Sequence, residues 1–399
     1  MSPVSILPVI FSIASELVLI YFLVKFFEKD KKEESVKFDS IDGLRGFLAF
    51  FVFLHHACIY YFCFPTYVWE LPPSQLYSHF GSTSVCLFFM ITSFLFITKL
   101  IENKNKQVDW LKFIVSRVLR LYPLYMIAFI ISVFYAALLS EFKFVEPVLT
   151  VTKELTQWFL FSVFDGPDIN SVKLTPAFML SVLWSLKYEW VFYLFLPIIG
   201  FIFFKAKPTI ITLILTIGIA SLILIYTPIM AINLFAFTGG IFAAFLARSN
   251  KFCQLASGKI ASVLIVICLT LTVTFFETAF EIMPLILISI AFVGIACGNS
   301  LFGILTHRLS RNFGRLSYGI YLLQGLILFA VFRLWMGFEL LASFSPLQYW
   351  LLVIAIGLVL TLICYFLYHL IEAPSLRKTG KVTSFLRKFI PDFLQQKIA

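Results

Sequence analysis

One apolar stretch of the chain, residues 42–57, reads DGLRGFLAFFVFLHHA and carries ionisable side chains at Asp42, Arg45, His55 and His56. On a helix, Arg45 and His56 lie within about 20° of the same face and about 16 Å apart along the axis. An imidazole accepts protons near neutral pH, and an arginine binds phosphate or carboxylate groups. The pair therefore has the residue types for general-base catalysis on an anionic substrate. The structural alternative is that Arg45 extends to lipid headgroups while His56 hydrogen-bonds a neighbouring helix.

The composition indicates that this stretch lies in a membrane. Hydrophobic residues make up 61% of the 399 residues, charged residues 13%, and the mean hydropathy is +0.97, whereas soluble domains carry roughly 25% charged residues. Because a span needs about 20 apolar residues, we expect an all-α, polytopic transmembrane helical bundle of about eleven spans. The predicted spans are 5–27, 42–64, 80–101, 119–140, 177–204, 209–228, 230–247, 258–277, 283–304, 316–338 and 347–371.

The distribution of basic residues predicts the orientation, because lysine and arginine accumulate in cytoplasmic segments. Most of the 31 lysines and arginines fall on one side if the N-terminus is outside and the C-terminus cytoplasmic. The net charge of +10 then follows from the cytoplasmic segments, which would contact anionic membrane lipids. No nucleic-acid partner is needed to explain this charge. The predicted cytoplasmic segments are 25–41, 99–120, 205–207, 248–259, 308–315 and 377–397.

Further motifs follow the charged stretch in a fixed order. They are GSTSVCLFFMITSFLF at 81–96, RVLRLYPLY at 117–125, LWSLKYEWVFYLFLP at 183–197, GRLSYGIYLLQ at 314–324 and IEAP at 371–374. Together with DGLR and the Arg-x10-His spacing, this set resembles the acyltransferase-3 family of bacterial membrane O-acyltransferases. The chain departs from that pattern at Gln324, where histidine is common, and at Ser93, where glycine is usual.

The resemblance covers about residues 38–376 and predicts a domain division. Residues 1–37 would be an additional N-terminal transmembrane helix with a basic cytoplasmic linker. Residues 38–376 would form the acyltransferase-3-like membrane domain of about ten helices, and residues 377–399 a basic cytoplasmic tail.

The resemblance also implies a catalytic site. His56 would take the proton from an acceptor hydroxyl, or accept the acyl group itself before passing it on. Arg45 would face the donor at the inner surface, and Glu189 would orient His56 or pair with an arginine, with Arg45 or His56 as its natural partner. The other predicted site residues are Arg117 and Arg120 for the phosphates of acyl-CoA, and Ser185 and Tyr193 as weaker candidates for substrate or oxyanion hydrogen bonds.

These arginines and polar residues also have structural interpretations. Arg117 and Arg120 have the spacing that forks onto phosphates, but they equally suit an ordinary cytoplasmic loop. Ser185 and Tyr193 could simply bridge helices. Glu372 we expect to pair with one of three arginines at 308, 311 and 315. The seven cysteines lie mostly in apolar runs without CxxC spacing, so we expect neither disulfides nor a metal site.

The function implied is an O-acyltransferase of the bacterial inner (cytoplasmic) membrane. It would move an acyl group, most often acetyl, from cytoplasmic acyl-CoA to a hydroxyl of a cell-surface glycan or glycolipid such as lipopolysaccharide O-antigen or exopolysaccharide. The alternative is a secondary transporter of a glycan precursor or small solute that uses Arg45, His56 and Glu189 as a substrate or proton site. A membrane scaffold is a third interpretation, but it would not need an arginine and a histidine on one helix face.

Overall fold

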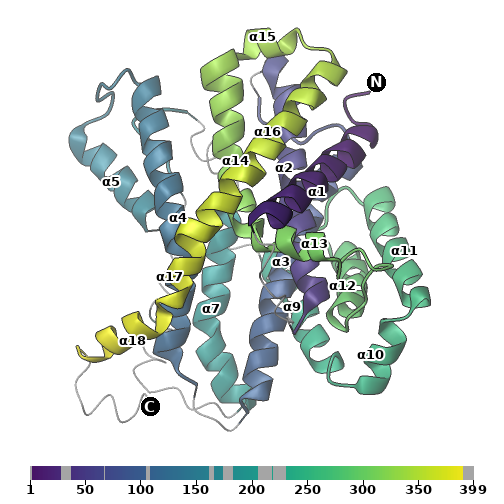
Figure 1. Ribbon diagram of the computed structural model, residues 1–399. Helices are drawn as coiled ribbons and strands as arrows, with labels where there is room; N and C mark the ends of the chain where they lie inside the picture. The colour runs from purple at the N-terminus through teal and green to yellow at the C-terminus, as the bar shows by residue number, and fades with distance from the viewer. Residues whose placement is uncertain are drawn as a thin grey trace. The chain divides into compact units, whose positions relative to one another are not determined.

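A computed structural model describes residues 2–27, 37–66, 68–104, 108–160, 166–173, 183–204, 218 and 231–389 (Figure 1). All the named elements in these ranges are helical, which confirms the predicted all-α class. They are α1 (Leu7–Phe27), α2 (Asp39–Thr66), α3 (Gln75–Glu102), α4 (Trp110–Leu139), α5 (Val148–Phe159), α7 (Leu183–Phe204), α9 (Ala231–Leu246), α10 (Asn250–Ala256), α11 (Lys259–Phe275), α12 (Ile282–Ala296), α13 (Arg308–Arg315), α14 (Ser317–Phe329), the π-helix η1 (Ala330–Met336), α15 (Phe338–Ala342), α16 (Pro346–Leu367), the π-helix η2 (Tyr368–Glu372), α17 (Ala373–Arg377) and α18 (Thr379–Arg387).

Seven helices within these described ranges are long and apolar enough to cross a membrane. Six of them are α1, α2, α3, α4, α7 and α14 with its continuation η1, and the seventh begins with α16. Helices α9 and α10, bent by 117° at their junction, are an eighth candidate, and α11 and α12 are shorter apolar helices. The chain is therefore an integral membrane protein with a polytopic helical bundle. The predicted span 209–228 lies outside the described residues except for residue 218, and the N-outside orientation stays a prediction.

The chain divides into two compact parts. The first contains Met1–Leu95 and Ala231–Tyr365, and the second contains Phe96–Met230 and Phe366–Ala399. The boundaries fall within α3, at the start of α9 and within α16, and the division predicted along the sequence stays a prediction. We describe each part separately.

Helix α2 packs against α13 in the first part with almost no space between the two backbones. A Cβ atom on Gly314 would lie 1.7 Å from the Asp42 carbonyl oxygen, and one on Gly43 would lie 1.8 Å from the carbonyl oxygen of Leu305, in the segment that leads into α13. No side chain larger than hydrogen fits at these positions. The glycines of DGLRG and GRLSY therefore let the helix that carries Arg45 pack tightly against α13.

Helix α1 belongs to the same part. The Trp350 indole Nε1 donates a hydrogen bond of 2.9 Å to the Pro3 carbonyl, and the Tyr77 hydroxyl donates one of 3.0 Å to the Ser5 carbonyl. Midway along α1, the Glu16 side chain is 1% exposed and lies against Gly357 of α16. The start of the chain is therefore attached to α3 and α16 by specific contacts.

Ser93, the residue that departs from the usual glycine, lies at the contact between α3 and α9. Its hydroxyl donates to the Phe237 carbonyl at 2.7 Å, and the close approach of the two helices is provided by Gly240, where a Cβ would lie 2.1 Å from the Ser93 Oγ. A glycine on the partner helix thus allows the close approach, and Ser93 adds an interhelical hydrogen bond.

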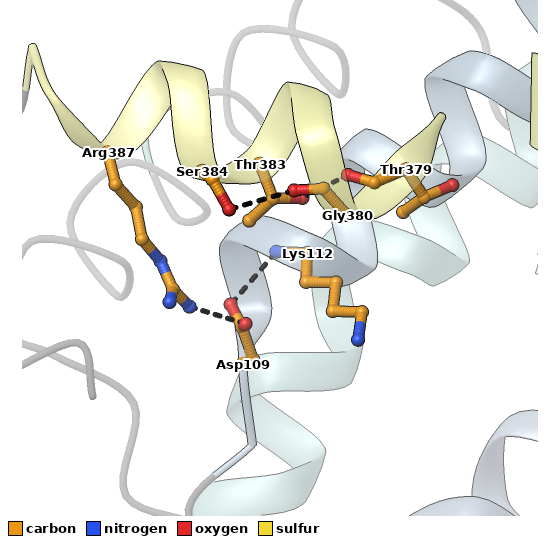
Figure 2. Close-up of polar contacts among 7 residues, drawn as sticks. All are labelled: Asp109, Lys112, Thr379, Gly380, Thr383, Ser384 and Arg387. Atoms are coloured by element: carbon orange, nitrogen blue, oxygen red, sulfur yellow. Dashed lines mark hydrogen bonds and ion pairs between the residues drawn. The ribbon is translucent and has the colours of Figure 1, made fainter. Parts of the chain in front are cut away.

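In the second part, α18 packs across the beginning of α4 (Figure 2). The Asp109 carboxylate caps α4 by accepting the backbone N–H of Lys112 at 3.0 Å, and it also forms an ion pair with Arg387 of α18. Thr383, on the same helix, is buried. One aspartate therefore both starts α4 and attaches the C-terminal helix to it.

Candidate active site

The first part contains Arg45 and His56. Helix α2 runs without interruption through both residues, so the predicted spacing of eleven positions along one helix is confirmed. Arg45 is half-buried and His56 is buried, with 7% of its surface exposed. The two side chains therefore lie about 16 Å apart along the helix axis.

His56 is surrounded by rings and one amide. The imidazole lies 6.1 Å from the indole of Trp69, ring centre to ring centre, and the carboxamide of Gln324 on α14 faces it. Gln324 is completely buried, and its Nε2 donates to the Tyr321 carbonyl at 3.2 Å. Within the described part of the chain, neither the Nδ1 atom of His56 nor the Oε1 atom of Gln324 makes a hydrogen bond of standard geometry, although the Gln324 side chain and the Val52 backbone lie within hydrogen-bonding reach of the His56 ring. A buried imidazole beside a buried amide, with polar atoms left short of ideal hydrogen bonds, is a candidate place for a polar ligand.

His55, the neighbouring histidine, has a structural role. Its Nδ1–H donates a hydrogen bond of 2.7 Å to the Tyr77 carbonyl on α3, and the ring is buried. This bond fixes the tautomer and the orientation of the ring. Because His55 is held by this hydrogen bond, His56 is the better candidate of the two adjacent histidines to act on a substrate.

The second part contains the remaining predicted residues. On α7, the Tyr193 hydroxyl donates a hydrogen bond of 3.0 Å to the Glu189 carboxylate, and the Arg117 guanidinium of α4 lies beside the same hydroxyl. Arg117 also lies over the ring of Phe96, 5.0 Å from its centre. Ser185 is buried one turn before Glu189. The structure thus gathers Arg117, Tyr193 and Glu189 into one polar cluster.

Glu189 belongs to the second part of the chain, whereas the helix that carries Arg45 and His56 belongs to the first part. The two parts are described separately. The proposed pairing of Glu189 with Arg45 or His56 therefore stays a prediction. Arg120, predicted beside Arg117 as a phosphate ligand, forms an ion pair of 3.9 Å with Glu372, whose side chain is 1% exposed. Glu372 thus pairs with Arg120. Arg311, one of the three arginines expected to pair with Glu372, pairs with Asp39 at 2.8 Å instead.

We expect the change Tyr193→Phe to weaken the polar cluster, because it removes a hydroxyl that donates to a carboxylate. The free energy of unfolding should fall by about 1 kcal/mol, measured as the thermal transition of the purified protein in detergent. The matched control is Tyr122→Phe, which removes a hydroxyl bonded to the Phe159 carbonyl at an exposed position. An unchanged transition in Tyr193→Phe would show that the hydroxyl contributes nothing to the cluster.

A separate cavity of about 870 Å³ lies among α9, α10, α11 and α12. Its lining carries no charged side chain, and its two hydroxyls, on Thr238 and Ser289, each donate to a carbonyl of their own helix at 2.6 Å. The cavity therefore offers no groups for acid–base chemistry. Across the described residues, no group of three or more His, Cys, Asp or Glu side chains could hold a metal ion.

Two features of the described structure were not anticipated from the sequence. The buried Glu16 escaped notice, although it is the single acidic residue of the apolar run 5–27 and could have been found on that ground. The clustering of Lys99 and Lys112 with Arg117 could not have been found, because these lysines look like ordinary cytoplasmic residues in the sequence.

The fold is that of a membrane-embedded helical bundle, and one of its long helices carries a half-buried arginine and a buried histidine. A family model described as an acyltransferase domain matches residues 38–369. The chain therefore belongs to the acyltransferase-3 family. No curated protein and no solved structure matches the chain.

Proposed function

We propose that the chain transfers an acyl group, in the first instance acetyl, from cytoplasmic acyl-CoA to a hydroxyl of a cell-surface glycan or glycolipid. Lipopolysaccharide O-antigen and exopolysaccharide are the acceptors of this kind that we favour, and the bacterial inner membrane is the proposed location. The observation that carries the proposal is the buried imidazole of His56, which lies beside the buried carboxamide of Gln324. A proton acceptor beside a hydrogen-bond acceptor suits an incoming hydroxyl.

The proposed reaction is direct transfer. His56 takes the hydroxyl proton while the hydroxyl oxygen bonds to the carbonyl carbon of the thioester. The carbon–sulfur bond then breaks, and the CoA thiolate leaves with the electron pair and receives the proton from the imidazolium. Arg45, about 16 Å away along α2, would hold the donor at a distance comparable to an extended pantetheine arm.

The residues of the second part have supporting roles in this proposal. Arg117 would bind phosphate groups of the donor, and Glu189 would orient a cationic or imidazole group, with Ser185 and Tyr193 as hydrogen-bond donors. Arg120 is the second predicted phosphate ligand, but its ion pair with Glu372 favours a structural role.

Purified protein in lipid nanodiscs tests the proposal. With acetyl-CoA and a carbohydrate acceptor, we expect release of free CoA thiol that depends on the acceptor, together with an acceptor heavier by one acetyl group in mass spectrometry. The alternative is a secondary transporter that uses Arg45, His56 and Glu189 as a substrate or proton site. If CoA neither binds nor reacts, while a glycan precursor or solute is carried across the membrane of proteoliposomes, the transporter is the correct interpretation.

A further inference from the structure

The apolar cavity of the first part has dimensions that suit a lipid chain. It lies among α9, α10, α11 and α12, which are neighbours in that part (Figure 1). Five residues of α9 line it at helical spacing, from Ile232 to Leu246, a length of about 21 Å along the helix axis. Half of the hydrocarbon core of a bilayer is about 15 Å thick. The cavity is therefore long enough for an acyl chain of one leaflet.

The lining of the cavity is apolar and open to its surroundings. Phe235, Phe242 and Leu264 are among the lining residues, and they are 60%, 66% and 50% exposed. The hydroxyls of Thr238 and Ser289 are already bonded within their own helices. A lipid chain in the surrounding bilayer can thus enter from the side, and it meets no polar group that needs a partner.

One end of the cavity carries basic residues. Helix α10, bent by 117° from α9, provides part of the lining at this end. Arg248, Lys251 and Lys259 each lie within two residues of a side chain that lines the cavity, and all three are exposed. None of their side chains forms an ion pair or a hydrogen bond with another described residue. Three cations are therefore available to an anionic group at this end.

The opposite end has the opposite charge. Residues 231–276 contain no aspartate or glutamate. Helix α11 begins at Lys259 and ends at Phe275, about 24 Å further along its axis. The next ionisable residues, Glu277 and Glu281, lie beyond that end. This difference in charge favours one orientation of an anionic lipid, with its headgroup beside α10 and its chain directed along α9.

We infer that this cavity binds one anionic phospholipid, such as phosphatidylglycerol. An acyl chain lies in the cavity along α9, and the phosphate lies beside Arg248, Lys251 and Lys259. These three residues belong to the predicted cytoplasmic side, where anionic lipids attract lysine and arginine. A zwitterionic headgroup also carries an ammonium group, which the same cations would repel. The lipid site is additional to the proposed function and does not depend on acyl transfer.

Native mass spectrometry of the full chain tests the inference. The protein is purified in detergent and titrated with phosphatidylglycerol, or with phosphatidylcholine that has the same acyl chains. The wild-type protein should bind one phosphatidylglycerol at least about tenfold more tightly than phosphatidylcholine. In the triple variant Arg248→Gln/Lys251→Gln/Lys259→Gln, this preference should largely disappear, because the lipid phosphate loses its three cations.

Two comparisons separate the headgroup from the chain. The variant Arg377→Gln/Lys378→Gln/Lys381→Gln removes three exposed basic residues of the predicted cytoplasmic tail, so it should keep the wild-type preference. Thr238→Trp places an indole in the cavity and should weaken binding of both lipids by about tenfold. Its matched control is Thr270→Trp, at an exposed position of α11 outside the lining, which should bind both lipids as the wild type does.

Three results would overturn the inference. The first is equal affinity of the wild-type protein for the two lipids, or a preference that survives in the triple glutamine variant. The second is unchanged lipid binding in Thr238→Trp, which would place the chain elsewhere. The third is a dimer without bound lipid that Thr238→Trp disrupts, which would assign the cavity to a second copy of the chain. The proposed function is judged separately, by acyl transfer from acetyl-CoA.

Discussion

Replacing His56 with alanine is expected to lower the rate of acyl transfer by about 10²–10⁴-fold, because the reaction would lose its general base. CoA release in the presence of acceptor is the measurement. The amount of protein in the membrane should stay close to that of the wild type, since the Nδ1 atom of His56 makes no hydrogen bond of standard geometry to the described residues. Binding of CoA should change little, because Arg45, the proposed donor contact on the same helix, lies about 16 Å away along α2.

Two further variants make this result specific. His56→Gln preserves most of the side-chain volume but cannot accept the proton, so it should be as inactive as alanine. His307→Asn is the matched control, because it removes an exposed imidazole and keeps a side chain able to cap α13. Acyl transfer at the wild-type rate in either His56 variant would contradict the proposed role of this histidine.

Changing Gly314 to alanine is expected to prevent α2 and α13 from packing as they do. The new Cβ would lie 1.7 Å from the Asp42 carbonyl oxygen, and backbone atoms cannot move aside as a flexible side chain can. We expect the free energy of unfolding to fall by about 3 kcal/mol and much of the protein to be lost from the membrane. Size-exclusion chromatography with a fluorescent fusion and a thermal unfolding curve measure both effects.

Gly380→Ala is the matched control for this change. A Cβ at Gly380 meets no atom within 4 Å, and the residue lies inside α18. The same substitution there should leave stability unchanged or raise it by up to about 1 kcal/mol, because alanine favours the helix. If Gly314→Ala were as stable as Gly380→Ala, the close approach of α2 and α13 would not be required.

Most helices were predictable because a helix that crosses the hydrocarbon core of a bilayer needs about 20 apolar residues, and such runs are visible in the sequence. The predicted run 5–27 corresponds to α1 (Leu7–Phe27), and 230–247 corresponds to α9 (Ala231–Leu246). The run 283–304 is too long, since α12 ends at Ala296. The chain turns there through Gly298 and Leu301, both at positive φ, and such a turn between apolar residues leaves hydropathy unchanged.

The candidate site was predictable only along single helices. The spacing of Arg45 and His56 depends on helix geometry alone, and α2 has that geometry. The position of Gln324 opposite His56 depends on how α14 packs, and no local pattern encodes that contact. The gathering of Lys99 with Lys112 likewise depends on the arrangement of α3 against α4.

The contacts of α1 bear on the size of the stable protein. The family match begins at residue 38, yet the Trp350 and Tyr77 side chains donate hydrogen bonds to carbonyls at Pro3 and Ser5. A chain shortened to the matched region would leave both donors without these acceptors and would expose the surface around Gly357 to lipid. We therefore expect the stable protein to extend beyond the matched domain and to include the first helix as a structural component.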